Sequence, residues 1–154
     1  MIYLRWPRVN RRPAQSLGCG LERDRIAAFA GSLARCLAIP DFLTRFYEVF
    51  AASSPEVAEK FKNTDFEKQK RAMSSSLYVM IMALEGGGAA LVYLEQIARR
   101  HSRGDLDIGP EMYDVWLDCL VQAVQEHDPQ ASDDTETLWR DAMRPGIEFM
   151  RARY

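Results

Sequence analysis

Apolar residues after residue 20 recur at helical spacing, and turn-forming residues separate one group from the next. In the first group, over about 21–36, Ile26, Phe29 and Leu33 fall on one side of a helix. No segment alternates apolar and polar residues for long enough to build a sheet. We therefore predict an all-α chain of seven or eight helices, with neither an internal repeat nor a domain boundary after residue 20.

Capping and turn residues predict where these helices begin and end. Pro40 suits the first turn of a second helix, because that position needs no backbone donor. Ser54-Pro55-Glu56 indicates the start of a short helix that leads to Phe61. Thr64-Asp65-Phe66-Glu67 has the capping-box pattern and would open a long helix to about residue 84, ended by the glycines at 86–88.

Three further helices follow from the same reasoning. They are expected over about 89–101, over 110–127, and from a cap formed by Asp133 with Glu136 to the C-terminal region. Pro145 and Gly146 lie inside the last of them and should bend it.

Composition excludes several classes of protein. The 154 residues, of which 47% are hydrophobic and 27% charged, suit one globular domain with a core. No apolar run approaches the roughly 20 residues that span a bilayer, so we expect no membrane span. A net charge of −2 gives no reason to expect nucleic acid as a partner. Three cysteines without paired spacing indicate reduced thiols in a cytoplasmic protein, with a redox role for Cys19 as the alternative.

Residues 1–20 differ from the rest of the chain. Arg5, Arg8, Arg11 and Arg12 meet no acidic residue in this segment, and it has no continuous apolar stretch of the kind found in signal peptides. We expect a flexible basic tail, or residues upstream of the natural start, ahead of one domain over 21–154. Weak binding to a membrane surface or an anionic partner is the alternative.

Few residues are placed to carry chemistry. The glycines at 86–88 lack the lysine of a phosphate-binding loop, and no paired histidines have zinc-site spacing. His127 closes a helix between Glu126 and Asp128, where a structural role is expected. His101 ends an apolar stripe one turn after Ile97. Taken by itself, such a histidine is more often a core or capping residue than a ligand.

The order of several short motifs resembles that of bacterial globins, most closely a small single-domain subgroup. Four features resemble the distal half of a globin: Phe-Tyr-x-x-Phe at 46–50, Ser-Pro-Glu-Val at 54–57, Phe61, and Thr-Asp-Phe-x-x-Gln at 64–69. Arg-His-Ser-Arg-Gly-x-x-x-Ile-x-Pro-x-x-Tyr at 100–113 resembles the proximal half, and Asp-Thr-Glu-x-x-Trp at 134–139 resembles the start of a globin's last helix. The resemblance implies a globin fold around a haem pocket, with haem b as the cofactor.

It also implies roles for individual residues. His101 matches the proximal iron ligand. The residues expected to line the pocket are Tyr47, Phe61, Gln69, Met73, Leu77, Ile108, Tyr113 and Trp116. Tyr47 and Gln69 would donate hydrogen bonds to a bound gas. Two alternatives stay open: the distal helix could be rotated so that Lys70 or Arg71 replaces Gln69, and Tyr47 could be a core residue with its hydroxyl on a backbone carbonyl.

The proximal side departs from the pattern of flavin-linked bacterial haemoglobins, which place a glutamate late in the final helix. Residues 150–154 hold no carboxylate, so the ring nitrogen of His101 is expected to bond a backbone carbonyl one turn back, leaving the iron less electron-rich. Arg99, Arg100 and Arg103 could pair with the haem propionates or form a solvated rim.

The function that the resemblance implies is reversible binding of oxygen or another diatomic gas, such as nitric oxide or carbon monoxide, by a monomer or homodimer. The alternative is a nitric oxide dioxygenase, which would need a separate reductase because the sequence ends at Tyr154 without a flavin domain. A haem-free regulatory domain of globin shape and a purely structural helical bundle are further alternatives.

Overall fold

A computed structural model describes residues 21–154, and the predicted tail over 1–20 lies outside the described residues. All regular structure in 21–154 is helical, which confirms the predicted class. The seven helices are α1 (Arg23–Leu37), α2 (Phe42–Ala52), α3 (Pro55–Phe61), α4 (Phe66–Leu84), α5 (Gly88–His101), α6 (Met112–His127) and α7 (Thr135–Arg151).

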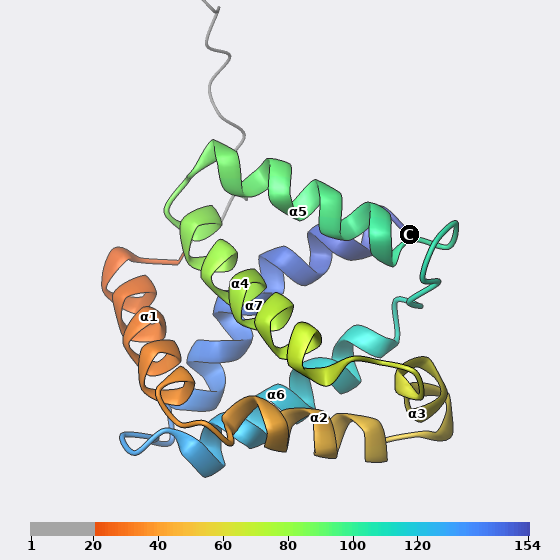
Figure 1. Cartoon of the computed structure of the whole chain (residues 1–154). Coiled ribbons are helices and arrows are strands. Elements are labelled where there is room, and N and C mark those ends of the chain that lie inside the picture. The colour runs from red at the N-terminus through yellow and green to blue at the C-terminus, as the bar shows by residue number, and fades with distance from the viewer. Residues whose placement is uncertain (1–20) are drawn as a thin grey trace, which may run out of the picture.

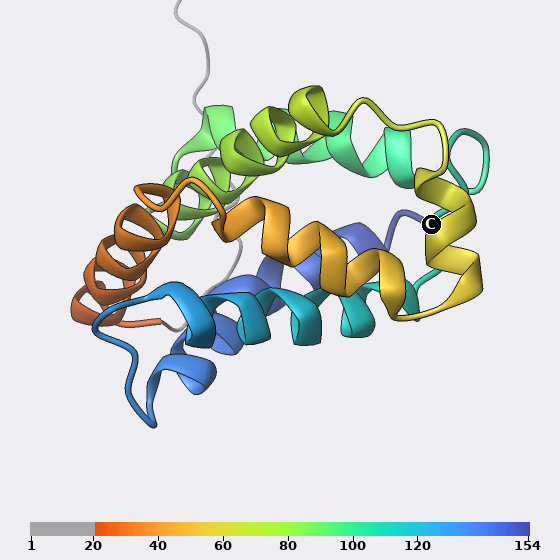
Figure 2. The same cartoon turned by 60° about the horizontal axis from the view of Figure 1, so that its bottom comes forward.

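The helices pack in two crossed layers. Figure 2 shows α4 and α5 above α2, α6 and α7, with α1 at one end and α3 at the other. α2 packs along α6, and α4 packs on α5 and across α7 (Figure 1). This arrangement leaves α3 and the end of α5 at the same end of the molecule.

The short helix α3 begins where the sequence predicts. The Ser54 hydroxyl accepts a hydrogen bond from the Val57 backbone N–H at 3.2 Å, and Pro55 occupies the first turn. Serine is favoured at this position because it satisfies a backbone donor that the helix leaves free.

Three predicted helix starts are wrong in detail. Pro40 precedes α2, because it lies in a turn closed by the Phe42 N–H bond to the Ile39 carbonyl at 3.2 Å. Asp65 caps α4 in place of a Thr64–Glu67 capping box, since its carboxylate accepts from the Lys68 N–H at 3.2 Å.

The start of α7 also differs from the prediction. α7 begins after Asp134, which makes no side-chain cap bond. The Thr135 hydroxyl reaches back instead and accepts from the Ser132 N–H at 2.8 Å. This bond fixes the preceding turn, and the predicted helix cap by Asp133 with Glu136 does not form.

A buried polar network ties α1 to both ends of the α6–α7 connection. The Trp139 indole N–H donates to the Ser32 hydroxyl at 2.9 Å, and that hydroxyl donates to Asp128 at 2.6 Å. Arg35 donates two further bonds to the Asp128 carboxylate, at 2.6 and 2.8 Å. Because every member has a partner, the network orients three elements without leaving a buried polar group unsatisfied.

α7 remains helical through Pro145, and the next residue, Gly146, lies against Met80 of α4. A Cβ placed on Gly146 would lie 2.5 Å from the Met80 sulfur and 2.8 Å from its methyl carbon. Glycine is thus required for Met80 to sit where it does. Within 21–154 no single helix is long and apolar enough to cross a membrane, although α1 and α2, bent by 92°, pass that test of length and composition together.

Candidate functional site

A cavity of about 580 Å³ lies between the two helical layers. All of the residues predicted to form the site line it: Tyr47, Phe61, Gln69, Met73, Leu77, His101, Ile108, Tyr113 and Trp116. They come from five helices and from the loop after α5, so the fold gathers residues that are more than 60 positions apart in the sequence. Its volume falls within the range of about 300–1,000 Å³ of small-molecule and cofactor pockets.

His101 is the last residue of α5 and presents one free ring nitrogen. Its Nδ1 lies 2.8 Å from the Ile97 carbonyl oxygen, as the sequence predicted for a ring nitrogen without a carboxylate partner. Because a carbonyl only accepts, Nδ1 carries the proton and donates. No hydrogen bond involves Nε2 in residues 21–154. Burial lowers the pKa of His101, so the imidazole is neutral and its Nε2 lone pair is available to a metal.

The α4 wall of the cavity carries Gln69, Met73, Leu77 and Met80 at helical spacing. The Tyr47 hydroxyl donates to the backbone carbonyl of Gln69 at 3.5 Å, the upper limit of a hydrogen bond. Burial raises the pKa of Tyr47 to about 12, so the phenol keeps its proton. This is the carbonyl contact left open as an alternative for Tyr47, but the side chain also lines the cavity.

Aromatic rings pack together at the α3 end of the cavity. The Phe61 ring centroid lies 5.7 Å from those of both Tyr47 and Phe50, in edge-to-face contact. Such pairs hold one another in place beyond what burial alone provides. Phe61 is therefore a fixed wall of the cavity.

Two features of the cavity lining were not predicted from the sequence. Five methionines line the cavity, namely Met73, Met80, Met112, Met143 and Met150, whereas only Met73 was predicted to do so. Met143 and Met150 belong to an apolar stripe on α7, and such a stripe is equally expected on a helix that packs in the core. Lys60 also lines the cavity, and no sequence signal separates it from the other exposed lysines of this region.

The three arginines near His101 lie in different surroundings. Arg100 lines the cavity and pairs with Asp105 at 3.1 Å. Arg99 and Arg103 do not line it. Arg99 lies 3.9 Å from Glu95, and the Arg103 guanidinium lies over the Tyr154 ring at 4.9 Å from its centroid.

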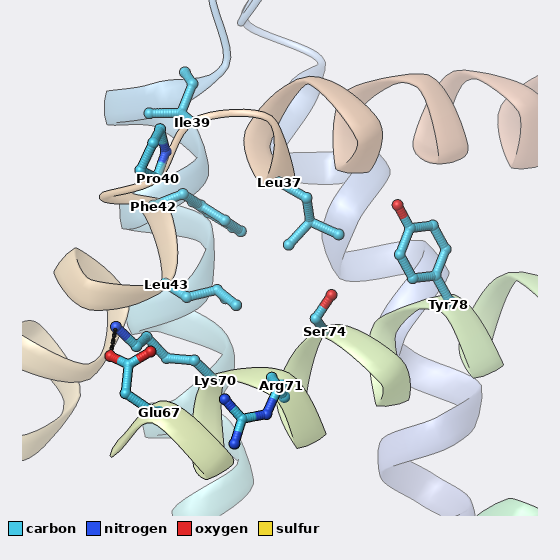
Figure 3. Close-up of a pocket in the computed structure, with 10 residues that line it drawn as sticks. All are labelled: Leu37, Ile39, Pro40, Phe42, Leu43, Glu67, Lys70, Arg71, Ser74 and Tyr78. Carbon is cyan, nitrogen blue, oxygen red and sulfur yellow. Dashed lines mark ion pairs between the residues drawn. The ribbon is translucent and has the colours of Figure 1, made fainter.

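A second, smaller cavity of about 420 Å³ lies on the other face of α4 (Figure 3). Lys70 and Arg71 line this second cavity, together with the end of α1 and the start of α2. Lys70 pairs there with Glu67 at 2.6 Å. Of Gln69, Lys70 and Arg71, only Gln69 lines the larger cavity, and its role toward a ligand stays a prediction.

The chain is similar in sequence and in fold to known proteins. The family model described as Globin matches residues 44–147. A crystal structure of a Pseudomonas aeruginosa protein, described as structurally highly homologous to a human hemoglobin, superposes with a TM-score of 0.77. It is 38% identical in sequence, and the match covers 85% of this chain and 96% of that one.

Flavohemoproteins of Bacillus thuringiensis and Bacillus anthracis are each 28% identical over 104 residues. The match covers 66% of this chain, and it spans a quarter (25%) of the length of these relatives.

Proposed function

The chain belongs to the globin family, and on this premise we propose that it holds one haem b in the larger cavity, with His101 as the iron ligand, and binds oxygen or another diatomic gas reversibly. The observation that carries the proposal is the neutral imidazole of His101, whose Nε2 has no hydrogen-bond partner in the described residues. The haem would supply the iron at which a gas binds.

The lining of the cavity fits an iron porphyrin, which is a large, flat and mostly apolar group. Methionine side chains adapt to the outline of a ligand, and the ring of Phe61 gives a flat surface. Arg100, which also lines the cavity, is exposed and cationic, as a carboxylate of such a group requires.

Two residues that line the cavity, Tyr47 on α2 and Gln69 on α4, offer donors to a bound gas. The Tyr47 phenol is protonated, and its long bond to the Gln69 carbonyl is weak enough to be exchanged. The Gln69 amide makes no side-chain hydrogen bond in the described residues. Each donor would stabilise a partly negative oxygen by about 1 kcal/mol, or roughly five-fold in affinity.

A second function, nitric oxide dioxygenation with a separate reductase, is favoured by the similarity to the flavohemoproteins. The proximal hydrogen bond favours reversible binding instead. Nδ1 of His101 donates to a neutral carbonyl, which makes the imidazole a weaker electron donor than one bonded to a carboxylate.

A cytoplasmic location is proposed because the buried Cys36 and Cys119 are free thiols.

Absorption spectra test the proposal. The chain, purified and supplied with haem, should take up one equivalent and show a Soret band that shifts on reduction and again on adding carbon monoxide. The oxygenated protein should then release oxygen without oxidising. Absence of haem uptake would refute the cofactor. Rapid formation of nitrate from nitric oxide with an added electron donor, exceeding that of a storage globin, would favour the second function.

A further inference from the structure

The loop over 102–109 follows His101 and closes one side of the larger cavity. It supplies Leu106 and Ile108 to the cavity lining. Asp107 adopts a φ of 52°, and no other residue except glycine has a positive φ within 21–154. Such a conformation persists only where the surroundings hold it, because it is unfavourable for a residue with a Cβ.

Side chains from two distant segments hold this loop. The Lys60 ammonium donates to the Leu106 carbonyl at 3.0 Å and to the Asp107 carbonyl at 2.8 Å. The Tyr154 hydroxyl donates to the Asp107 carboxylate at 2.7 Å. In residues 21–154 the two Lys60 bonds are the only hydrogen bonds that join α3 to this loop.

These bonds connect the two sides of the cavity. Lys60 precedes Phe61 on α3, and both residues line the cavity. On the other side, the loop is fixed to the end of α5 by the Ile108 N–H bond to the His101 carbonyl at 3.0 Å. Figure 1 shows the C-terminus beside the end of α5 and this loop, where Tyr154 makes its contact. A flat group that passed between α3 and the loop would have to break the two Lys60 bonds.

We propose that Lys60 is a positioning residue: its bonds to the loop carbonyls keep the cavity closed at the edge of the haem and slow haem loss, with Tyr154 fixing the same loop from the C-terminal side. This inference rests on the proposed function, because it concerns the haem that the cavity would hold. The lysine acts on the protein backbone and not on the haem itself.

Haem transfer from the loaded protein to an excess of apomyoglobin tests the proposal. Lys60→Met should lose haem about five-fold faster than the unmodified chain, as expected for hydrogen bonds of this kind. Tyr154→Phe should also lose haem faster than the unmodified chain, but by a smaller factor than Lys60→Met. Lys62→Met is the matched control, because Lys62 is exposed, pairs with Glu59 and does not line the cavity. Its rate should stay within about two-fold.

Two further measurements separate this role from others. The urea midpoint of the haem-free Lys60→Met chain should be unchanged, because the bonds act on the rim and not on the core. Haem with methyl-esterified propionates should leave the five-fold effect of Lys60→Met intact. If the ester abolishes the effect, Lys60 acts by pairing with a propionate and the proposal is wrong.

The remaining outcomes are distinct. Equal rates of haem loss from Lys60→Met and the unmodified chain would refute the positioning role and leave the proposed function standing. A lowered urea midpoint that accounts for the whole increase in rate would assign Lys60 to general stability and also refute that role. Failure of the unmodified chain to take up haem would overturn the proposed function, and the positioning role with it.

Discussion

Replacing Asp128 by asparagine is expected to lower the free energy of unfolding by about 2 kcal/mol at neutral pH. The side chain is only 1% exposed, and its carboxylate accepts bonds from Arg35 at 2.6 and 2.8 Å and from Ser32 at 2.6 Å. The Arg35 bonds, chiefly, lower the pKa of Asp128 from 3.8 to about 2. At about 1.4 kcal/mol per pH unit, that difference stabilises the fold by about 2 kcal/mol, once the partial exposure of Arg35 is allowed for.

The pH dependence follows from the direction of this pKa shift. Because the folded pKa is below the unfolded one, the stabilisation is complete above about pH 4 and is lost as the pH falls through about 2. The Asp128→Asn chain lacks it at every pH. The difference in unfolding free energy between the two chains should therefore shrink to about half its neutral value near pH 3.

Urea unfolding at pH 7 and pH 3, on protein in the same state of haem loading, measures both effects. Glu126→Gln is the matched control. The pKa of Glu126 is also lowered to about 2, chiefly by Arg45, but its side chain is 36% exposed. A surface pair of this kind contributes at most about 1 kcal/mol. Equal losses for the two variants, or a difference for Asp128→Asn that does not narrow at pH 3, would refute the reasoning.

Three further predictions concern the cavity and its supports. Tyr47→Phe should speed oxygen release about five-fold in a stopped-flow displacement by carbon monoxide, and an unchanged rate would show that the phenol does not contact the gas. Gly146→Ala should speed haem loss by about three-fold, because its Cβ would lie 2.5 Å from the Met80 sulfur and displace the flexible end of a side chain that lines the cavity; unaltered transfer to apomyoglobin would count against this. Ser54→Ala should lower the unfolding free energy by about 1 kcal/mol in urea, since the Val57 N–H loses its cap, and no change would mean that water replaces the hydroxyl fully.

Helical periodicity was sufficient to predict the fold class, because each apolar stripe must be buried against another helix. The order of the motifs identified the family, and the predicted site residues do line one cavity. The roles of these residues in binding iron and gas stay predictions.

The errors fall where local patterns have more than one structural solution. Thr64 and Asp65 are both residue types that cap helices. In the structure the Thr64 N–H closes a turn with the Phe61 carbonyl, and Asp65 caps α4. Met143 and Met150 lie on a stripe whose sequence is the same whether it meets another helix or a cofactor. Lys60 bonds to carbonyls 46 and 47 positions away, which no local pattern encodes.

The most direct test of the central claim is the iron–imidazole stretching band in the resonance Raman spectrum of the ferrous, haem-loaded protein. If Nε2 of His101 binds the iron, the band is present in the unmodified chain, disappears in His101→Gly, and returns when free imidazole is added to that variant. Persistence of the same band in His101→Gly without added imidazole would contradict the assignment of His101 as the iron ligand.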